Sequence, residues 1–168
     1  NRGVYLEGYH GEETTGLYVY NLDSGKLSEA QFRDRQFDFD ATADYKFYQR
    51  ELIGLNYEKD VPTAVWFLPK MQKIQERVDG ILSGRINIIE GWSDDFQKHL
   101  IYSYSDVVPA EYYLLDLEKG KVIEISKSAP WVDHDQLART QIFRFKTSDG
   151  LTLQGYLTLP RRGKAPYP

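Results

Sequence analysis

Serine and histidine side chains are the first candidates for chemistry, because a serine hydroxyl held against an imidazole base can act as a nucleophile. No serine has glycines at both −2 and +2, the pattern of a nucleophile elbow, and only Ser93 has one at −2. The histidines, His10, His99 and His134, are spread over the chain with no local pairing to a serine. We therefore predict no catalytic Ser-His site and assign the serines to turns and strand faces. The serines are Ser24, Ser28, Ser83, Ser93, Ser103, Ser105, Ser126, Ser128 and Ser148.

Two carboxylates, Asp38 and Asp40, alternate with Phe37 and Phe39. On a strand they would share one face about 7 Å apart, since each residue rises about 3.3 Å. Paired acids at a suitable separation can hydrolyse glycosides, but only where they flank a sugar in a cleft and one pKa is raised. We expect instead an exposed polar face beside two core phenylalanines, and keep a glycosidase as a distant alternative.

Two other charged clusters were considered as binding sites. Asp133-His134-Asp135 is the densest group of metal-ligating types, but adjacent side chains point in different directions, so we interpret it as a solvated loop. Arg161, Arg162 and Lys164 form a basic patch that could meet phosphate. A net charge of −4 gives a nucleic-acid or membrane partner no support, so we interpret this patch as a solvated linker. We expect no metal and no cofactor.

Tyrosine is unusually common, with 13 residues in the chain. Such rings could stack on sugars or on peptide side chains at an open face. We expect them mainly to pack within and between sheets, with the hydroxyl reaching the rim. The strand tyrosines in question are Tyr18, Tyr20, Tyr102, Tyr104, Tyr112 and Tyr113.

Composition limits the remaining classes. A chain of 168 residues that is 41% hydrophobic and 27% charged is globular, with room for one domain or one domain and an appended piece. The absence of cysteine excludes disulfides, thiolate nucleophiles and zinc–thiolate sites, but leaves a cytoplasmic or periplasmic location open. The longest strongly apolar stretch, residues 61–69, is far shorter than the roughly 20 residues of a membrane span.

Most of the chain alternates with period 2, which indicates strands. The runs 18–27 and 113–122 align at an offset of 95 residues, and each contains a Gly-Lys turn, Gly25-Lys26 and Gly120-Lys121. Two units averaging about 47 residues, one enlarged by an insertion, would approach the roughly 40–50 residues of a four-stranded propeller blade. Further strands are predicted at 51–57, 63–68, 85–92, 99–105, 111–117 and 121–125.

The insertion is a predicted helix at about residues 69–83. Met71, Ile74, Val78 and Ile81 lie on one helical stripe, and Pro69 suits the first turn. It is most simply a cover over a sheet edge, and a regulatory flap is the alternative.

A different hairpin closes the chain. Phe143 and Phe145 alternate with charged residues, Ser148-Asp149-Gly150 makes a turn, and the leucines of residues 151–159 line one face of a second strand. The segment 129–133 is interpreted as a boundary, which predicts domains at 1–130 and 131–168. Because the chain opens inside an alternating run and stops in a basic, proline-containing stretch, we expect a piece of a longer polypeptide.

Two motifs carry a resemblance to a known family. Residues 145–160, FKTSDGLTLQGYLTLP, with Pro166-Tyr167-Pro168 behind them, are similar to the propeller-to-hydrolase junction of the prolyl oligopeptidase family of serine peptidases. Residues 89–95, IEGWSDD, and 112–117, YYLLDL, followed by Gly120-Lys121, resemble the last propeller blade of its acylaminoacyl-peptidase-like members. The resemblance implies a mainly β fold: four-stranded antiparallel β-propeller blades with one inserted helix, ending in the first strands of an α/β-hydrolase domain.

For the parent protein the resemblance implies hydrolysis of short peptides by a Ser-Asp-His triad. That triad would follow Pro168, so no catalytic residue is assigned in this chain. We expect a non-catalytic fragment whose partners are the rest of the peptidase and, in the parent, a short peptide. Self-association through uncovered blade faces is also expected. The alternative is a free-standing β-propeller-like binding module without enzymatic activity.

Overall fold

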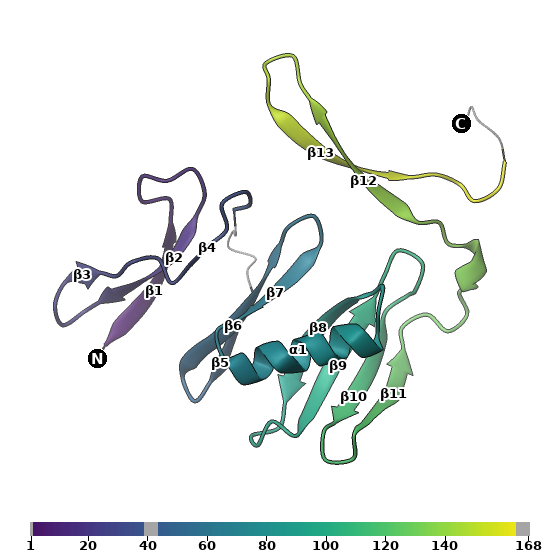
Figure 1. The fold of residues 1–168 in the computed structure, drawn as a ribbon, viewed down its shortest axis with the longest axis horizontal. Coiled ribbons are helices and arrows are strands. Elements are labelled where there is room, and N and C mark those ends of the chain that lie inside the picture. The colour runs from purple at the N-terminus through teal and green to yellow at the C-terminus, as the bar shows by residue number, and fades with distance from the viewer. Residues whose placement is uncertain (1, 39–43, 164–168) are drawn as a thin grey trace. The chain divides into compact units, whose positions relative to one another are not determined.

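The computed structural model describes residues 2–38 and 44–163, which are mainly β and form several antiparallel sheets (Figure 1). Contacts divide the chain into two compact units, Asn1–Gln72 and Lys73–Pro168. The first unit contains β1 (Gly3–Gly8), β2 (Gly16–Asn21), β3 (Lys26–Leu27), β4 (Phe32–Arg33), β5 (Asp44–Tyr48), β6 (Glu51–Glu58) and β7 (Pro62–Trp66). Helix α1 (Pro69–Ile81) begins in it and ends in the second. The second unit contains β8 (Ile86–Trp92), β9 (Lys98–Tyr104), β10 (Glu111–Asp116), β11 (Lys121–Lys127), the short 3₁₀ helix η1 (His134–Gln136), β12 (Thr140–Lys146) and β13 (Thr152–Thr158).

The described residues of the first unit form two sheets. In one, β1 pairs with β2, while β3 and β4 both pair with the other side of β2 and so form a single interrupted row. In the other, β5, β6 and β7 form an antiparallel meander. Leu17 of β2 and Leu55 and Tyr57 of β6 form a buried cluster, against which Phe32 and Val65 pack. The hydrophobic core of this unit therefore joins its two sheets.

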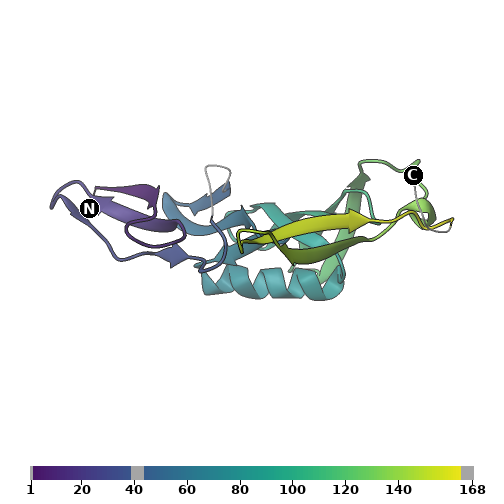
Figure 2. The same ribbon diagram turned by 90° about the horizontal axis from the view of Figure 1, so that it is seen from above.

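The second unit is built on a four-stranded antiparallel sheet in the order β11-β10-β9-β8. Helix α1 runs across a face of this sheet (Figures 1 and 2). Gln75 of the helix donates a hydrogen bond to the Asn87 carbonyl of β8 at 2.9 Å, and Val78 is buried. The predicted helix is thus confirmed, ending two residues earlier than expected. No helix in residues 2–38 and 44–163 is long and apolar enough to cross a membrane.

The offset of 95 residues that aligns the two hairpins also relates three pairs of strands in the described residues: β1 with β9, β2 with β10, and β3 with β11. In the hairpins, Asn21 pairs with Lys26 just as Asp116 pairs with Lys121. On the other side of each central strand, Gly3–Gly8 pairs along β2 in the register with which Lys98–Ser103 pairs along β10. The β1–β4 sheet is therefore a structural repeat of β9–β11. Both turns need a left-handed residue, supplied by glycines with φ of 65° and 62°, Gly25 and Gly120.

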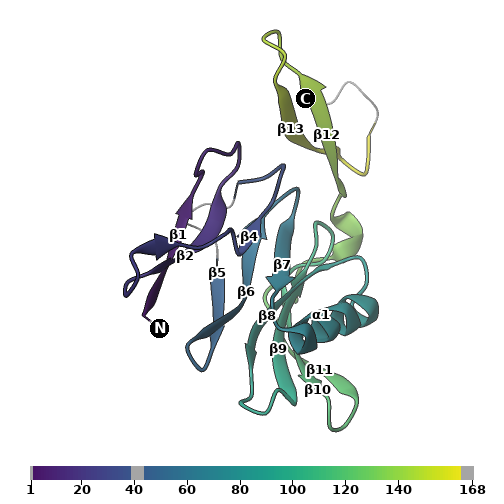
Figure 3. The same ribbon diagram turned by 60° about the vertical axis from the view of Figure 1, so that its left-hand side comes forward.

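The chain ends in a two-stranded hairpin, β12–β13 (Figure 3). Its predicted strands are confirmed, with Phe143 opposite Gly155 and Phe145 opposite Leu153. A Cβ on Gly155 would lie 2.5 Å from the Phe143 ring, so glycine lets this ring cross the neighbouring strand. Phe143, Phe145 and Leu153 are 44–45% exposed. A two-stranded hairpin with an uncovered apolar face is marginally stable by itself.

The other sequence predictions can be compared with these elements. The predicted strands between residues 51 and 125 are all present, with ends displaced by no more than about two residues. The expected uniform four-stranded blades are only partly found, since β5–β7 has three strands and the sheets of the described residues close no ring. The domain boundary near residue 130 and the start of a hydrolase domain stay predictions.

Candidate functional site

Arg33 of β4 is the centre of a polar recess in the first unit. Its guanidinium donates hydrogen bonds to the Thr14 carbonyl, to the Tyr18 hydroxyl and, at 3.2 Å, to the Tyr9 carbonyl. The guanidinium carbon also lies 5.9 Å from the centroid of the Tyr18 ring. Pairing of Arg33 with Gly16 across β2 and β4 places the arginine here, because glycine leaves room for the guanidinium. Arg33 therefore ties the β1–β2 connection to β4.

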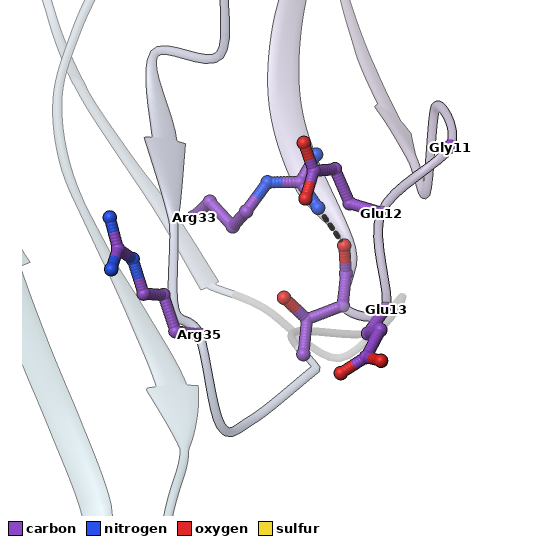
Figure 4. A pocket seen from close by; sticks show the side chains of 6 residues that line it. Gly11, Glu12, Glu13, Arg33 and Arg35 are labelled. Carbon is purple, nitrogen blue, oxygen red and sulfur yellow. Dashed lines mark hydrogen bonds between the residues drawn. The ribbon is translucent and has the colours of Figure 1, made fainter.

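A pocket of about 590 Å³ opens beside this arginine (Figure 4). The acidic residues Glu12 and Glu13 come from the β1–β2 connection, while Arg33 and Arg35 come from β4 and the residues after it. The lining has two positive and two negative side chains, which suits a ligand carrying both charges better than a simple anion. The Thr14 hydroxyl donates to the Asp34 carbonyl, so its proton is not directed at a ligand. The charges of the recess suit charged groups, and none of its described lining residues is an activated nucleophile.

Asp34 lies beside the recess and joins β4 to β6. Its Oδ2 accepts a hydrogen bond from the Tyr57 hydroxyl at 2.7 Å and lies 2.8 Å from Lys59 Nζ. Burial favours the neutral acid, but the bonds from Lys59, the Gln36 amide and Tyr57 outweigh it and hold the pKa of Asp34 well below its usual range. Asp34 is therefore an ionised structural anchor and not a proton donor.

The second unit contains a buried charge network that the sequence patterns did not reveal. Glu111 of β10 is 3% exposed, accepts bonds from Arg85 and Tyr113, and lies 3.2 Å from Lys127 Nζ. Burial raises the pKa of Glu111, but the bonds from Tyr113, Arg85 and Lys127 outweigh it and lower that pKa to about 2. Glu111 and Tyr113 share a strand face. Extending the predicted hairpin register would have placed Ser126 opposite Glu111, because Lys127 comes opposite it only through a β-bulge between Tyr112 and Tyr113.

One serine and one histidine named in the sequence analysis come together. His10 and Ser28 both line a smaller pocket of about 330 Å³, next to Tyr18 and Glu12. The Ser28 hydroxyl donates to the Glu29 carbonyl at 2.6 Å and accepts from the Val19 amide at 2.9 Å. Its only proton is thus used within the loop and not given to a base.

His99, Ser103 and Ser93 lie in structural positions. His99 is fully buried in β9, with Nε2 2.9 Å from the Phe96 carbonyl. Ser103 donates to Asn87 Oδ1 at 2.7 Å, and Ser93 donates to Asp95 within a turn. The prediction that the triad lies outside this chain stays a prediction.

The Asp38 and Asp40 hypothesis assumed a strand, and this was wrong for Asp38. Asp38 lies in a loop, where Oδ1 accepts from the Thr15 amide at 2.7 Å. The chain turns before it, because Asp34 accepts from the amides of Gln36 and Phe37. Phe37 packs against the core cluster as expected, and Asp40 lies outside the described residues.

The remaining charged candidates stabilise loops. Asp133 caps η1, accepting from the Asp135 amide and from Gln136 Nε2, each at 3.0 Å. Arg161 donates to the Asp135 carbonyl, and Arg162 is exposed, while Lys164 lies outside the described residues. Within residues 2–38 and 44–163, no cluster of three or more His, Asp or Glu side chains could hold a metal ion.

The tyrosines mostly pack as expected. Tyr18 and Tyr113 are buried, at 5% and 9% exposed. The ring centroid of Tyr102 lies 5.3 Å from that of Tyr104 and 5.1 Å from that of Tyr112, so these half-buried rings form a cluster on one face of the sheet. These tilted ring contacts account for the three tyrosines by packing within the sheet.

Comparison with known proteins supports the resemblance found in the sequence. No family model matches the chain. The chain is similar to dipeptidyl aminopeptidase BIII of Pseudoxanthomonas mexicana, with 24% identity over 163 residues, covering 96% of this chain and 23% of that protein. The chain thus spans about a quarter of the length of this relative. The similarity points to the prolyl oligopeptidase family of peptidases, the family that the junction motif resembles.

Proposed function

We propose that this chain is a non-catalytic part of a prolyl-oligopeptidase-like serine peptidase. The observation that carries the proposal is the similarity of 96% of the chain to 23% of a dipeptidyl aminopeptidase. The β8–β11 meander would be a blade of a propeller that admits short peptides and excludes folded proteins. The Ser-Asp-His triad would lie in polypeptide beyond this chain.

The hairpin β12–β13 supports a continuation into a second domain. Phe143, Phe145, Leu153 and Leu157 share one face and are 42–45% exposed. An apolar face of this kind is stabilised when another layer of structure covers it. We propose that the start of the α/β-hydrolase domain provides that layer. In the isolated chain the same face would favour self-association, which light scattering at rising concentration would detect.

Activity measurements test the proposed role directly. The purified chain is expected to release no chromophore from dipeptidyl or aminoacyl substrates and to take up no fluorophosphonate probe. A longer polypeptide from the same reading frame, containing a Gly-x-Ser-x-Gly motif, is expected to do both. Stoichiometric labelling of a serine in the present chain would overturn the proposal, and a stop codon directly after Pro168 would support the free-standing binding module instead.

A further inference from the structure

Helix α1 has little stability of its own. It is 13 residues long, close to the length below which an isolated helix is marginal in water. Its first turn contains Lys70 and no acidic residue, and its last turn contains Asp79 and no basic residue, so both charges oppose the helix dipole. Leu68, which precedes the helix, has no side-chain oxygen to cap the first amides, and Gly80 lies within the helix. The helix therefore depends on its contacts with the sheet.

Asn87 of β8 is the polar centre of these contacts. Its Nδ2 donates to Asp79 Oδ1 at 3.0 Å and to the Leu82 carbonyl at 3.2 Å, and its Oδ1 accepts from Ser103 Oγ at 2.7 Å. The Gln75 Nε2 donates to the main-chain carbonyl of Asn87 at 2.9 Å and to Asp79 Oδ1 at 3.0 Å. Asn87 and Gln75 are each 7% exposed. Because Leu82 directly follows α1, Asn87 also satisfies a carbonyl at the end of the helix.

An apolar face of the sheet lies next to this hydrogen-bond network. Ile89 and Ile101 are opposite each other on β8 and β9, and both are fully buried. Since side chains alternate along a strand, Ile89 lies on the same face as Asn87, the face that bonds to the helix. Ile74 and Val78 of α1 are also buried, at 5% and 1% exposed. Loss of the helix would therefore expose apolar side chains on the sheet as well as its polar network.

We propose that α1 is a releasable cover of the β8–β9 face, which folds and docks in one step and is held by the bonds of Gln75 and Asp79 to Asn87. Release breaks these bonds and unwinds the helix, while β10 keeps its partners on both sides, β9 and β11. The face containing Ile89 and Ile101 is then open to solvent. The proposal concerns motion within the second unit, so it holds or fails independently of the peptidase function.

Thiol labelling of the full chain tests whether α1 is released. The chain contains no cysteine, so Val78→Cys gives a single thiol on the buried side of the helix. We expect this thiol to react with the same opening constant that amide hydrogen exchange gives for α1, and the amides of β10 to open at least tenfold less often. The proposal is overturned if the thiol and the α1 amides open only as often as β10.

Two matched variants of the helix test the bonds to Asn87. Gln75→Met removes the bonds to Asn87 and Asp79 and keeps an unbranched side chain of similar length. Gln72→Met makes the same change at an exposed position of the same helix. We expect Gln75→Met to raise the opening constant of α1 by about tenfold and Gln72→Met to change it less than twofold, with β10 unaffected in both. Equal effects in the two variants would overturn the role of the Asn87 network. Gln75 is the better position to change, because Asn87→Ala would also remove the acceptor of Ser103 within the sheet.

Gly80→Ala tests whether folding and docking are one step. The added Cβ meets open space, and alanine favours the helix more than glycine does. If α1 unwinds on release, this change should slow both the α1 amides and labelling of the thiol at position 78 by about threefold or more. An unchanged labelling rate would mean that the helix leaves the sheet intact, which would overturn the coupling of folding to docking.

Discussion

The β1–β4 and β8–β11 sheets share a backbone arrangement but stabilise it with different chemistry. Position 16 is glycine in the first sheet, and its counterpart in the second is the buried Glu111. In the first sheet Arg33 uses this space and bonds to carbonyl oxygens and the Tyr18 hydroxyl. In the second sheet a carboxylate occupies it and binds two cationic side chains.

Comparison of the two sheets shows which features the repeats have in common. The register of β1 on β2 matches that of β9 on β10, and the hairpin turns are also the same, with glycine at the left-handed turn position. The register of the third row differs, since it is interrupted between β3 and β4 and bulged in β11. The polar groups between the strands are not the same. Tyr18 and Tyr113 do occupy corresponding positions. The ring centroid of Tyr18 lies 5.9 Å from the guanidinium carbon of Arg33, and that of Tyr113 lies 5.9 Å from the guanidinium carbon of Arg85. Both sheets have the tyrosine. The arginine comes from a different part of the sheet in each, and only the second sheet has the carboxylate.

The largest difference should appear when the carboxylate is removed. Glu111→Gln keeps the size of the side chain but leaves Arg85 and Lys127 without their shared anion. We expect the β8–β11 sheet to lose about 3 kcal/mol of stability, because one partner of a buried charged group is removed. Local opening free energies from amide exchange of β10 measure this loss. A loss below about 1 kcal/mol would mean that the network contributes little.

Acid should reproduce most of this effect in the unmodified chain. The folded-state pKa of Glu111, about 2, lies below its ordinary value of 4.5, so the unfolded state binds more protons between these pH values. The stabilisation is present above pH 4.5 and is lost as pH falls toward 2, for a total of about 3 kcal/mol. Exchange of β10 amides from pH 5 to pH 2 provides the measurement.

Glu111→Gln is the control for this pH dependence. The difference in β10 stability between variant and unmodified chain should shrink as pH falls, since the carboxylate is then neutral in both states. A local readout is needed because Asp34 makes the first unit acid-sensitive as well. A difference that stays constant down to pH 2 would contradict the assignment of the charge to Glu111.

The sequence was sufficient for some of this comparison and not for the rest. The hairpins could be aligned from Asp23-Ser24-Gly25-Lys26 and Glu118-Lys119-Gly120-Lys121, because turn chemistry is local. The repeat of β1 in β9 could not be found in the same way. Val4 corresponds to a buried histidine, His99, and no turn residue marks the pairing.

The site residues show the same limit. The Glu111 network joins residues from β10 and β11 with Arg85, which precedes β8, so its members meet only through tertiary pairing. Asp38 was expected on a strand because its neighbours alternate, but the side chain of Asp34 bonds to the amides of Gln36 and Phe37 and turns the chain there. Alternation is therefore a weaker guide where an aspartate can bond to the backbone ahead of it.

Gly16→Ala should produce a smaller loss, restricted to the first sheet. The added Cβ would lie 2.9 Å from Arg33 Nη2 and 3.1 Å from the Tyr18 ring, so the arginine must shift. We expect a loss of about 1–2 kcal/mol, measured by exchange of β2 amides. Gly8→Ala is the matched control, because Gly8 lies opposite Gly16 and has open space around its Cβ position. Equal losses in the two variants would mean that the Arg33 contact is not the cause.

The smallest effect should come from exchanging the turn residues between the repeats. Asn21 Oδ1 accepts from the amides of Asp23 and Ser24, and Asp116 Oδ1 accepts from the amide of Lys119, the counterpart of Ser24. Because both turns need only an oxygen acceptor, Asn21→Asp should change stability by less than about 0.5 kcal/mol. Asp116→Asn, at a side chain that is only 2% exposed, should change it by less than about 1 kcal/mol. The ion pair of Asp116 with Lys119 adds little, since Nζ lies 3.8 Å away on an exposed side chain. A loss above about 1 kcal/mol in either variant would show that the two turns are not equivalent, and exchange of the Gly25 and Gly120 amides would identify which turn had opened.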